Sequence, residues 1–112
     1  MYIHDIDIAH PPLTSGVAEE ILNNELNHIR STQKWRVIKI IHGKGTDEHP
    51  SILKQVVRNW AYRNRSHIRA IIPGEKYDID DPATQEMRRI CGQIPDPELG
   101  RMNAGITLIW IK

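Results

Sequence analysis

The chain has 112 residues, of which 39% are hydrophobic and 26% charged, so it can bury a core and is not disordered by composition. No apolar run approaches the roughly 20 residues that a membrane span needs, and the N-terminus lacks the basic-then-apolar pattern of a signal peptide. The single cysteine, Cys91, excludes an internal disulfide and any zinc site built from several cysteines. We therefore expect one domain over residues 1–112, no membrane association and a location in the reducing cytoplasm.

The net charge of +1 conceals a strong asymmetry along the chain. Residues 1–29 carry five acids and no Lys or Arg, residues 30–69 carry ten bases and two acids, and residues 70–112 carry five bases and seven acids. A basic segment between acidic ones favours a face that binds a polyanion. The alternative is a solvated basic helix whose charge is partly offset by an acidic first helix.

Periodicity and proline positions predict the first strand and helix. Tyr2–Ile8 alternates in the manner of a strand, which Pro11 and Pro12 end because proline lacks the N–H that a sheet needs. A helix is predicted from about Gly16, with one apolar stripe at helical spacing. The stripe consists of Val17, Ile21, Leu22, Leu26 and Ile29.

The middle of the chain predicts a buried strand and a second helix. Val37–Ile41 is a run of β-branched residues that only Lys39 interrupts, and Trp35 precedes it. The second helix begins at about Pro50, since proline is tolerated in a first turn. Its apolar stripe consists of Ile52 or Leu53, Val56, Val57 and Trp60.

The last third predicts two more strands around a short helix. The strands are His67–Ile72 and Ile106–Ile111, the helix is Ala83–Cys91, and Gln93–Asn103 is a loop rich in proline and glycine. The order is β-α-β-α-β-(α)-β, and a strand–helix–strand unit of this length favours parallel pairing of the first two strands. We expect an α/β fold, a two-layer sandwich with a four-stranded mixed sheet.

The turn His42-Gly43-Lys44-Gly45 leaves the buried strand at the sheet end where ligands of α/β proteins gather. The glycines permit a positive φ and bring backbone N–H groups close to a phosphate, and Lys44 adds a positive charge. His42 can move a proton near neutral pH. The spacing of a P-loop is absent, which argues against hydrolysis of nucleoside triphosphates. Taken alone, the turn also fits an ordinary connection between strand and helix.

The first strand ends in Asp7 and His10, which lie near His42 if the first two strands are neighbours. An acid and two histidines could orient a water, act as general acid and base, or share a metal. Each histidine also fits a plain loop position. The six histidines are scattered without a His-x-x-x-His pair, so we expect no cofactor; a divalent metal stays open as an alternative that this spacing does not support.

Together these motifs resemble the small MutS-related domain family, called Smr. Its signature is an Ile/Leu-Asp-x-His strand, an amphipathic helix, an apolar strand ending in His-Gly-Lys-Gly, a second helix, and a glycine before a hydrophobic last strand. The chain has these parts in this order over nearly its whole length. The matching segments are Ile6-Asp7-Ile8-Ala9-His10, Val17–Ile29, Val37–Gly45, Ile52–Trp60 and Ala104–Ile109.

The resemblance implies a nucleic-acid-binding α/β sandwich, in many members a nicking or single-strand endonuclease that acts on DNA in repair or on RNA. The second motif matches residue by residue, and Asp7 matches the acid of the first motif. Ala9 takes the place of the first motif's histidine, and His10 follows where the family has glycine. Residues 80–103 form a helical insertion longer than the family's norm, which covers a sheet edge, binds a partner or packs.

We expect an endonuclease with little sequence preference, in which Lys44 and the loop amides hold the scissile phosphate, His42 transfers a proton and Asp7 orients it. The expected catalytic residues are His42, Asp7 and His10. The expected phosphate-binding residues are Gly43, Lys44, Gly45, Lys54, Arg58, Arg63 and Arg65.

Two alternatives remain open at this point. One is a binding module that uses the same basic face without cutting. The other is an interaction domain whose insertion docks a protein. The sequence does not choose between DNA and RNA, and an open sheet edge would allow a homodimer without selecting it.

Overall fold

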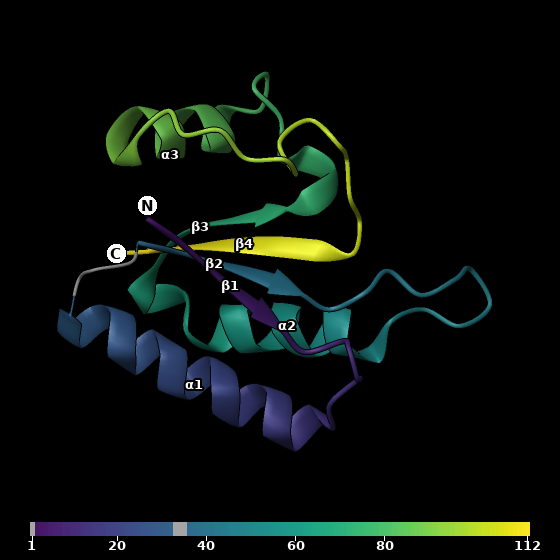
Figure 1. The fold of residues 1–112 in the computed structure, drawn as a ribbon. Helices are drawn as coiled ribbons and strands as arrows, with labels where there is room; N and C mark the ends of the chain where they lie inside the picture. The colour runs from purple at the N-terminus through teal and green to yellow at the C-terminus, as the bar shows by residue number, and fades with distance from the viewer. Residues whose placement is uncertain (1, 33–35) are drawn as a thin grey trace.

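A computed structural model describes residues 2–32 and 36–112, so Trp35 of the predicted strand entry lies outside the described residues. The order of helices and strands is the predicted one (Figure 1). The elements are β1 (Ile3–Asp7), α1 (Ser15–Thr32), β2 (Val37–Ile41), α2 (Ile52–Arg63), β3 (Ile68–Pro73), α3 (Pro82–Cys91) and β4 (Ile106–Ile111), with short 3-10 helices at Arg65–His67 and Gly74–Lys76.

The strands form one mixed sheet in the order β1-β2-β4-β3. β1 and β2 are parallel neighbours, as predicted, and β4 runs antiparallel to both β2 and β3. Asp7 is the register partner of Ile41, so β1 and β2 end side by side. The segments that follow these two strands therefore leave the sheet at the same end, which is where the sequence motifs lie.

The predicted α/β fold with a four-stranded mixed sheet is confirmed, and a third layer is added because helices cover both faces of the sheet. α1 and α2 lie on one face, and α3 lies on the other (Figure 1). The reason is that the sheet is apolar on both sides: every residue of β4 is buried, and Met87 of α3 packs into the cluster opposite α1 and α2. Of the alternatives for residues 80–103, packing is therefore confirmed for α3.

The two long helices turn their predicted stripes to the core, with small differences at their first turns. α2 begins at Ile52, two residues later than predicted, because the Ser51 side chain accepts a hydrogen bond from the Lys54 N–H and caps the helix. Leu53 is buried and Ile52 is exposed, which decides the alternative that the sequence left open. Val17 of α1, predicted to face inward, is exposed.

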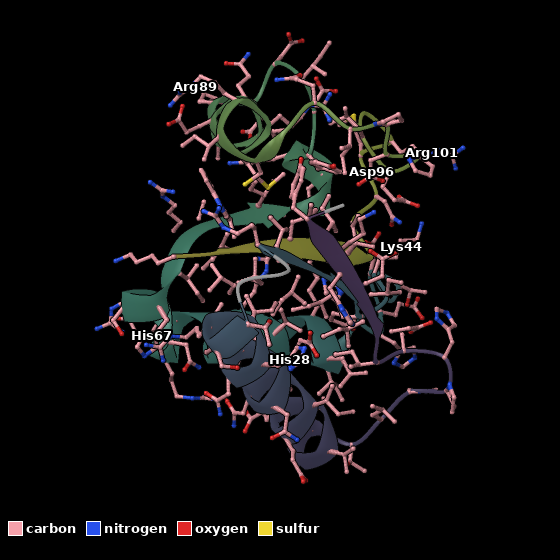
Figure 2. The ribbon with its side chains drawn as sticks, turned by 60° about the vertical axis from the view of Figure 1, so that its left-hand side comes forward. His28, Lys44, His67, Arg89, Asp96 and Arg101 are labelled. Atoms are coloured by element: carbon pink, nitrogen blue, oxygen red, sulfur yellow. The ribbon has the colours of Figure 1, made fainter. Side chains whose placement is uncertain are left out.

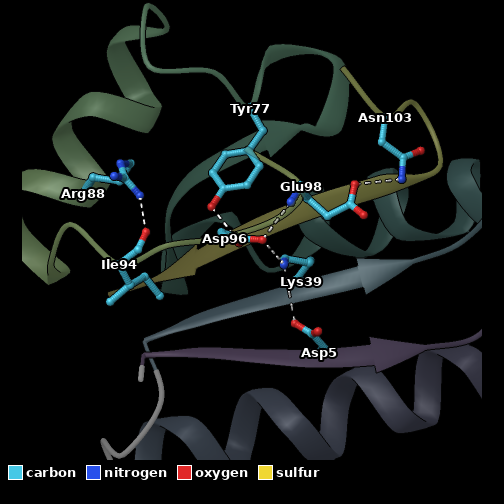
Figure 3. A network of polar contacts seen from close by, with 8 residues as sticks. All are labelled: Asp5, Lys39, Tyr77, Arg88, Ile94, Asp96, Glu98 and Asn103. Carbon is cyan, nitrogen blue, oxygen red and sulfur yellow. Dashed lines mark hydrogen bonds and ion pairs between the residues drawn. The ribbon is translucent and has the colours of Figure 1, made fainter. Parts of the chain in front are cut away.

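A buried ion pair holds the loop before β4 against the sheet (Figure 3). Lys39 Nζ lies 2.8 Å from Asp96 Oδ1, and the Tyr77 hydroxyl donates to Asp96 Oδ2 at 2.8 Å. The Glu98 N–H donates to Asp96 at 3.0 Å. These contacts explain why a lysine interrupts the apolar run of β2.

None of the helices in the described part of the chain is long and apolar enough to cross a bilayer.

Candidate functional site

The turn after β2 is fixed to the start of β4 by backbone contacts. The N–H groups of His42 and Gly43 both donate to the Gly105 carbonyl at 3.0 Å. The Gly43 amide is therefore engaged in a hydrogen bond that connects the turn to β4. Gly43 and Gly45 have φ values of +78° and +68°. A Cβ at Gly45 would lie 2.4 Å from the His49 carbonyl oxygen, so only glycine fits there.

His42 is buried beneath this turn, with 2% of its surface exposed. Its Nδ1 lies 2.6 Å from the Gly43 carbonyl oxygen, which can only accept, so Nδ1 carries the proton. Its Nε2 lies 2.8 Å from Thr107 Oγ1 and accepts from that hydroxyl. Burial lowers the pKa of His42 below its ordinary value, which keeps the ring neutral at neutral pH. Both ring nitrogens are therefore engaged in hydrogen bonds, and His42 connects the turn to β4.

The lowered pKa of His42 predicts a stability that depends on pH. Below about pH 6.5 the unfolded chain takes up a proton that the buried ring resists, so the free energy of unfolding falls as the pH is lowered. The His42→Gln variant lacks this titration and should lose less stability between about pH 7.5 and about pH 5.5. Urea unfolding of both proteins at the two pH values checks this, and equal losses in both would contradict it.

Asp7 and His10 form a hydrogen-bonded pair on the surface beside the turn. Asp7 Oδ1 accepts the N–H of Ala9 at 2.8 Å, and Asp7 Oδ2 lies 3.0 Å from His10 Nδ1. The hydrogen bond from Ala9, together with those from His10, lowers the pKa of Asp7 and keeps it ionised. The Asp7 carboxylate thus contacts His10. The sequence analysis had predicted that Asp7 orients His42, whose ring nitrogens contact Gly43 and Thr107 instead. The His10 side chain is 72% exposed, and its Nε2 is the atom left for proton transfer.

Two cavities open on either side of the turn. The first, of about 700 Å³, is lined by Lys44, Lys54 and Arg58, with Asp47 also on its wall. Lys54 and Arg58 are one helical turn apart and so project from the same face of α2. Lys54 Nζ also lies 3.4 Å from Glu75 Oε2. The cavity retains an excess of positive charge, which suits a phosphate.

The second cavity, of about 550 Å³, lies between the starts of α1 and α2. It is lined by both predicted histidines, His10 and His42, and by Leu13 and Ile52. The structure therefore brings His10 and His42 to one cavity, with Asp7 bound to His10. The two cavities share Gly45, Pro50 and Ser51 on their walls.

Two of the predicted phosphate-binding residues, Arg63 and Arg65, lie elsewhere. Arg63 Nη2 contacts Glu19 Oε1 of α1 at 2.8 Å, and the Arg65 guanidinium lies 4.2 Å from the ring centroid of Tyr62. Arg63 is the last residue of α2, about 16 Å along the helix from its first residue, and Arg65 begins the 3-10 helix that follows. His67, which lies in the same 3-10 helix as Arg65, is at the opposite end of the sheet from Lys44 (Figure 2).

Residues that the sequence analysis did not single out also build the site. Thr107 holds His42, and the Ser51 hydroxyl donates to the His42 carbonyl at 2.9 Å. Both left a signal in the sequence: Thr107 is the one polar residue within Ile106–Ile111, and Ser51 stands directly before an apolar helical stripe. Within residues 2–32 and 36–112, no three His, Cys, Asp or Glu side chains gather as a metal site would require.

Comparison with known proteins agrees with the fold and its motifs. The model of the Smr domain family matches residues 12–84, which include the turn after β2 but not the first motif. The crystal structure of the Smr domain of Thermus thermophilus MutS2 is similar to this chain with a TM-score of 0.55 at 18% identity, covering 100% of this chain and 99% of that one. No match was found among curated proteins.

Proposed function

The chain belongs to the Smr domain family, and on that premise we propose that it binds the phosphodiester backbone of nucleic acid. The observation that carries the proposal is the cavity of about 700 Å³ that gathers Lys44, Lys54 and Arg58 at the end of β2. Cationic side chains of this kind position a nucleic-acid backbone without reading its bases. We therefore expect little sequence preference.

We further propose that the Asp7–His10 pair makes this protein an endonuclease. Ionised Asp7 holds His10 Nδ1–H, so His10 Nε2 can accept a proton from a water that attacks phosphorus. The P–O bond to the leaving oxygen breaks as the new bond forms, and the leaving oxygen takes up a proton from water. Lys44 and the amide of Gly45 face the charge that develops on the phosphate. In this proposal His10 takes the proton-transfer role first given to His42, and His42 holds the turn in place.

A second candidate is binding without cleavage. Ala9 occupies the position of the family's first histidine, and it contributes only its backbone N–H to Asp7. If His10 does not replace that histidine in function, the basic cavity binds nucleic acid and leaves it intact.

The double variant Lys54→Met/Arg58→Met tests the proposed interface. Each removed phosphate contact lowers affinity and reduces the slope of log affinity against log salt by about one, so we expect a loss of about tenfold or more and a slope shallower by about two. Fluorescence anisotropy with a labelled single-stranded oligonucleotide measures both quantities over a range of salt concentrations.

The matched control is Arg63→Met/Arg65→Met, which removes the same two charges from the other end of α2. Its affinity should fall far less, because those arginines contact Glu19 and Tyr62. Equal losses in the two double variants would show that only net charge matters, and the proposed interface would be wrong.

A further inference from the structure

We propose that the cavity of about 550 Å³ beside the basic cavity receives one unpaired nucleobase. This inference rests on the proposed function, because the base would belong to the strand whose phosphate lies against Lys44, Lys54 and Arg58. It adds a substrate class to that function: a single strand, or a duplex with a locally unpaired nucleotide.

The first argument is the position of the cavity. Gly45, Pro50 and Ser51 line both cavities, so the two cavities are neighbours where Gly45 pairs with Pro50. A nucleotide has the same layout, with an anionic phosphate and an apolar base joined by one sugar. A strand bound through its phosphate in the basic cavity therefore places a neighbouring base at the entrance of the second one.

The second argument is the chemistry of the walls. The cavity has no Lys, Arg, Asp or Glu among its described lining residues, whereas the basic cavity has four such side chains. Leu13 and Ile52 offer apolar surface against which the flat face of a base can pack. The volume lies within the range of small-ligand pockets.

The third argument is the exposure of Ile52. This side chain is 74% exposed although it lies at the start of a helix whose next residue, Leu53, is buried. A large apolar side chain in water at the wall of a cavity gains free energy when a flat apolar ligand covers it. A base that is paired and stacked in a duplex cannot reach it, so the ligand must be unpaired.

The test compares a short oligothymidylate with a strand of the same length in which every nucleotide is abasic, and the same pair is prepared in RNA with uridylate. The two strands carry the same number of phosphates, so a difference between their affinities measures the contribution of the base. We expect the wild type to bind the intact strand about fivefold more tightly, and Ile52→Ala to reduce that ratio toward one. The matched control is Ile79→Ala, which removes the same atoms from another exposed isoleucine, 62% exposed, that does not line the cavity.

The outcomes separate this inference from the proposed function. If the wild type binds both strands equally, the base site is wrong while phosphate binding stands. If neither strand binds, the proposed function itself is wrong. A ratio that Ile52→Ala leaves unchanged, or that Ile79→Ala lowers equally, also overturns the base site, and circular dichroism confirms that each variant is folded.

Discussion

The His10→Ala variant is expected to cleave nucleic acid at least about a hundredfold more slowly than the wild type, because it removes the proposed general base. Binding should fall far less than the cleavage rate, because the side chains that hold the phosphate, Lys44, Lys54 and Arg58, are unchanged. Asp7→Asn should lose activity as well, because an amide cannot hold the His10 Nδ1–H as an ionised carboxylate does. Single-turnover cleavage of labelled single-stranded RNA and of supercoiled DNA measures these rates.

The control for this experiment is His28→Ala, which changes a histidine on α1 away from the turn (Figure 2). It should cleave at the wild-type rate. A His10→Ala protein that also cleaves at the wild-type rate would remove His10 from the mechanism. A wild-type protein that binds but cuts neither substrate would establish the binding module instead, with Ala9 as its physical reason.

The Asp96→Ala variant is expected to lose about 3 kcal/mol of unfolding free energy. Lys39 is 8% exposed and Asp96 4% exposed, so removal of the carboxylate leaves a buried ammonium without its close partner. The Tyr77 hydroxyl loses its acceptor at the same time. Urea denaturation monitored by circular dichroism measures the loss.

The matched control is Asp5→Ala, because Asp5 also faces Lys39 but is exposed and 3.9 Å away (Figure 3). An exposed pair contributes little, so this change should cost less than about 1 kcal/mol. Adding Lys39→Met to Asp96→Ala should restore part of the stability, since the unpaired charge is then gone. Equal losses for Asp5→Ala and Asp96→Ala would contradict the account of the buried pair.

The order of elements and the meeting of the two motifs could be predicted from the sequence. Periodicity and prolines define the strands and helices, and parallel pairing of β1 with β2 brings Asp7 and the His42 turn to one end of the sheet. What periodicity cannot supply is the direction of each side chain beyond a strand's end. Asp7 turns to His10 because its carboxylate accepts the N–H groups of Ala9 and His10, two and three residues further along the chain.

The sequence analysis also did not predict the third layer or the way in which the positive charges are divided along α2. A loop with two prolines carries no periodic signal, and the partner of Lys39 is 57 residues away in that loop. The basic stretch of residues 30–69 predicts one face, yet it spans the length of α2. Helix geometry therefore separates Lys54 and Arg58 at one end from Arg63 and Arg65 at the other.

The most direct test of the central claim is to map the nucleic-acid contact surface residue by residue. In a two-dimensional amide NMR titration with a short single-stranded oligonucleotide, the account predicts the largest shifts at Lys44, Gly45, Lys54 and Arg58, diminishing as salt is added. Largest shifts at Arg63 and Arg65, or on α3, with the turn after β2 unchanged, would contradict it.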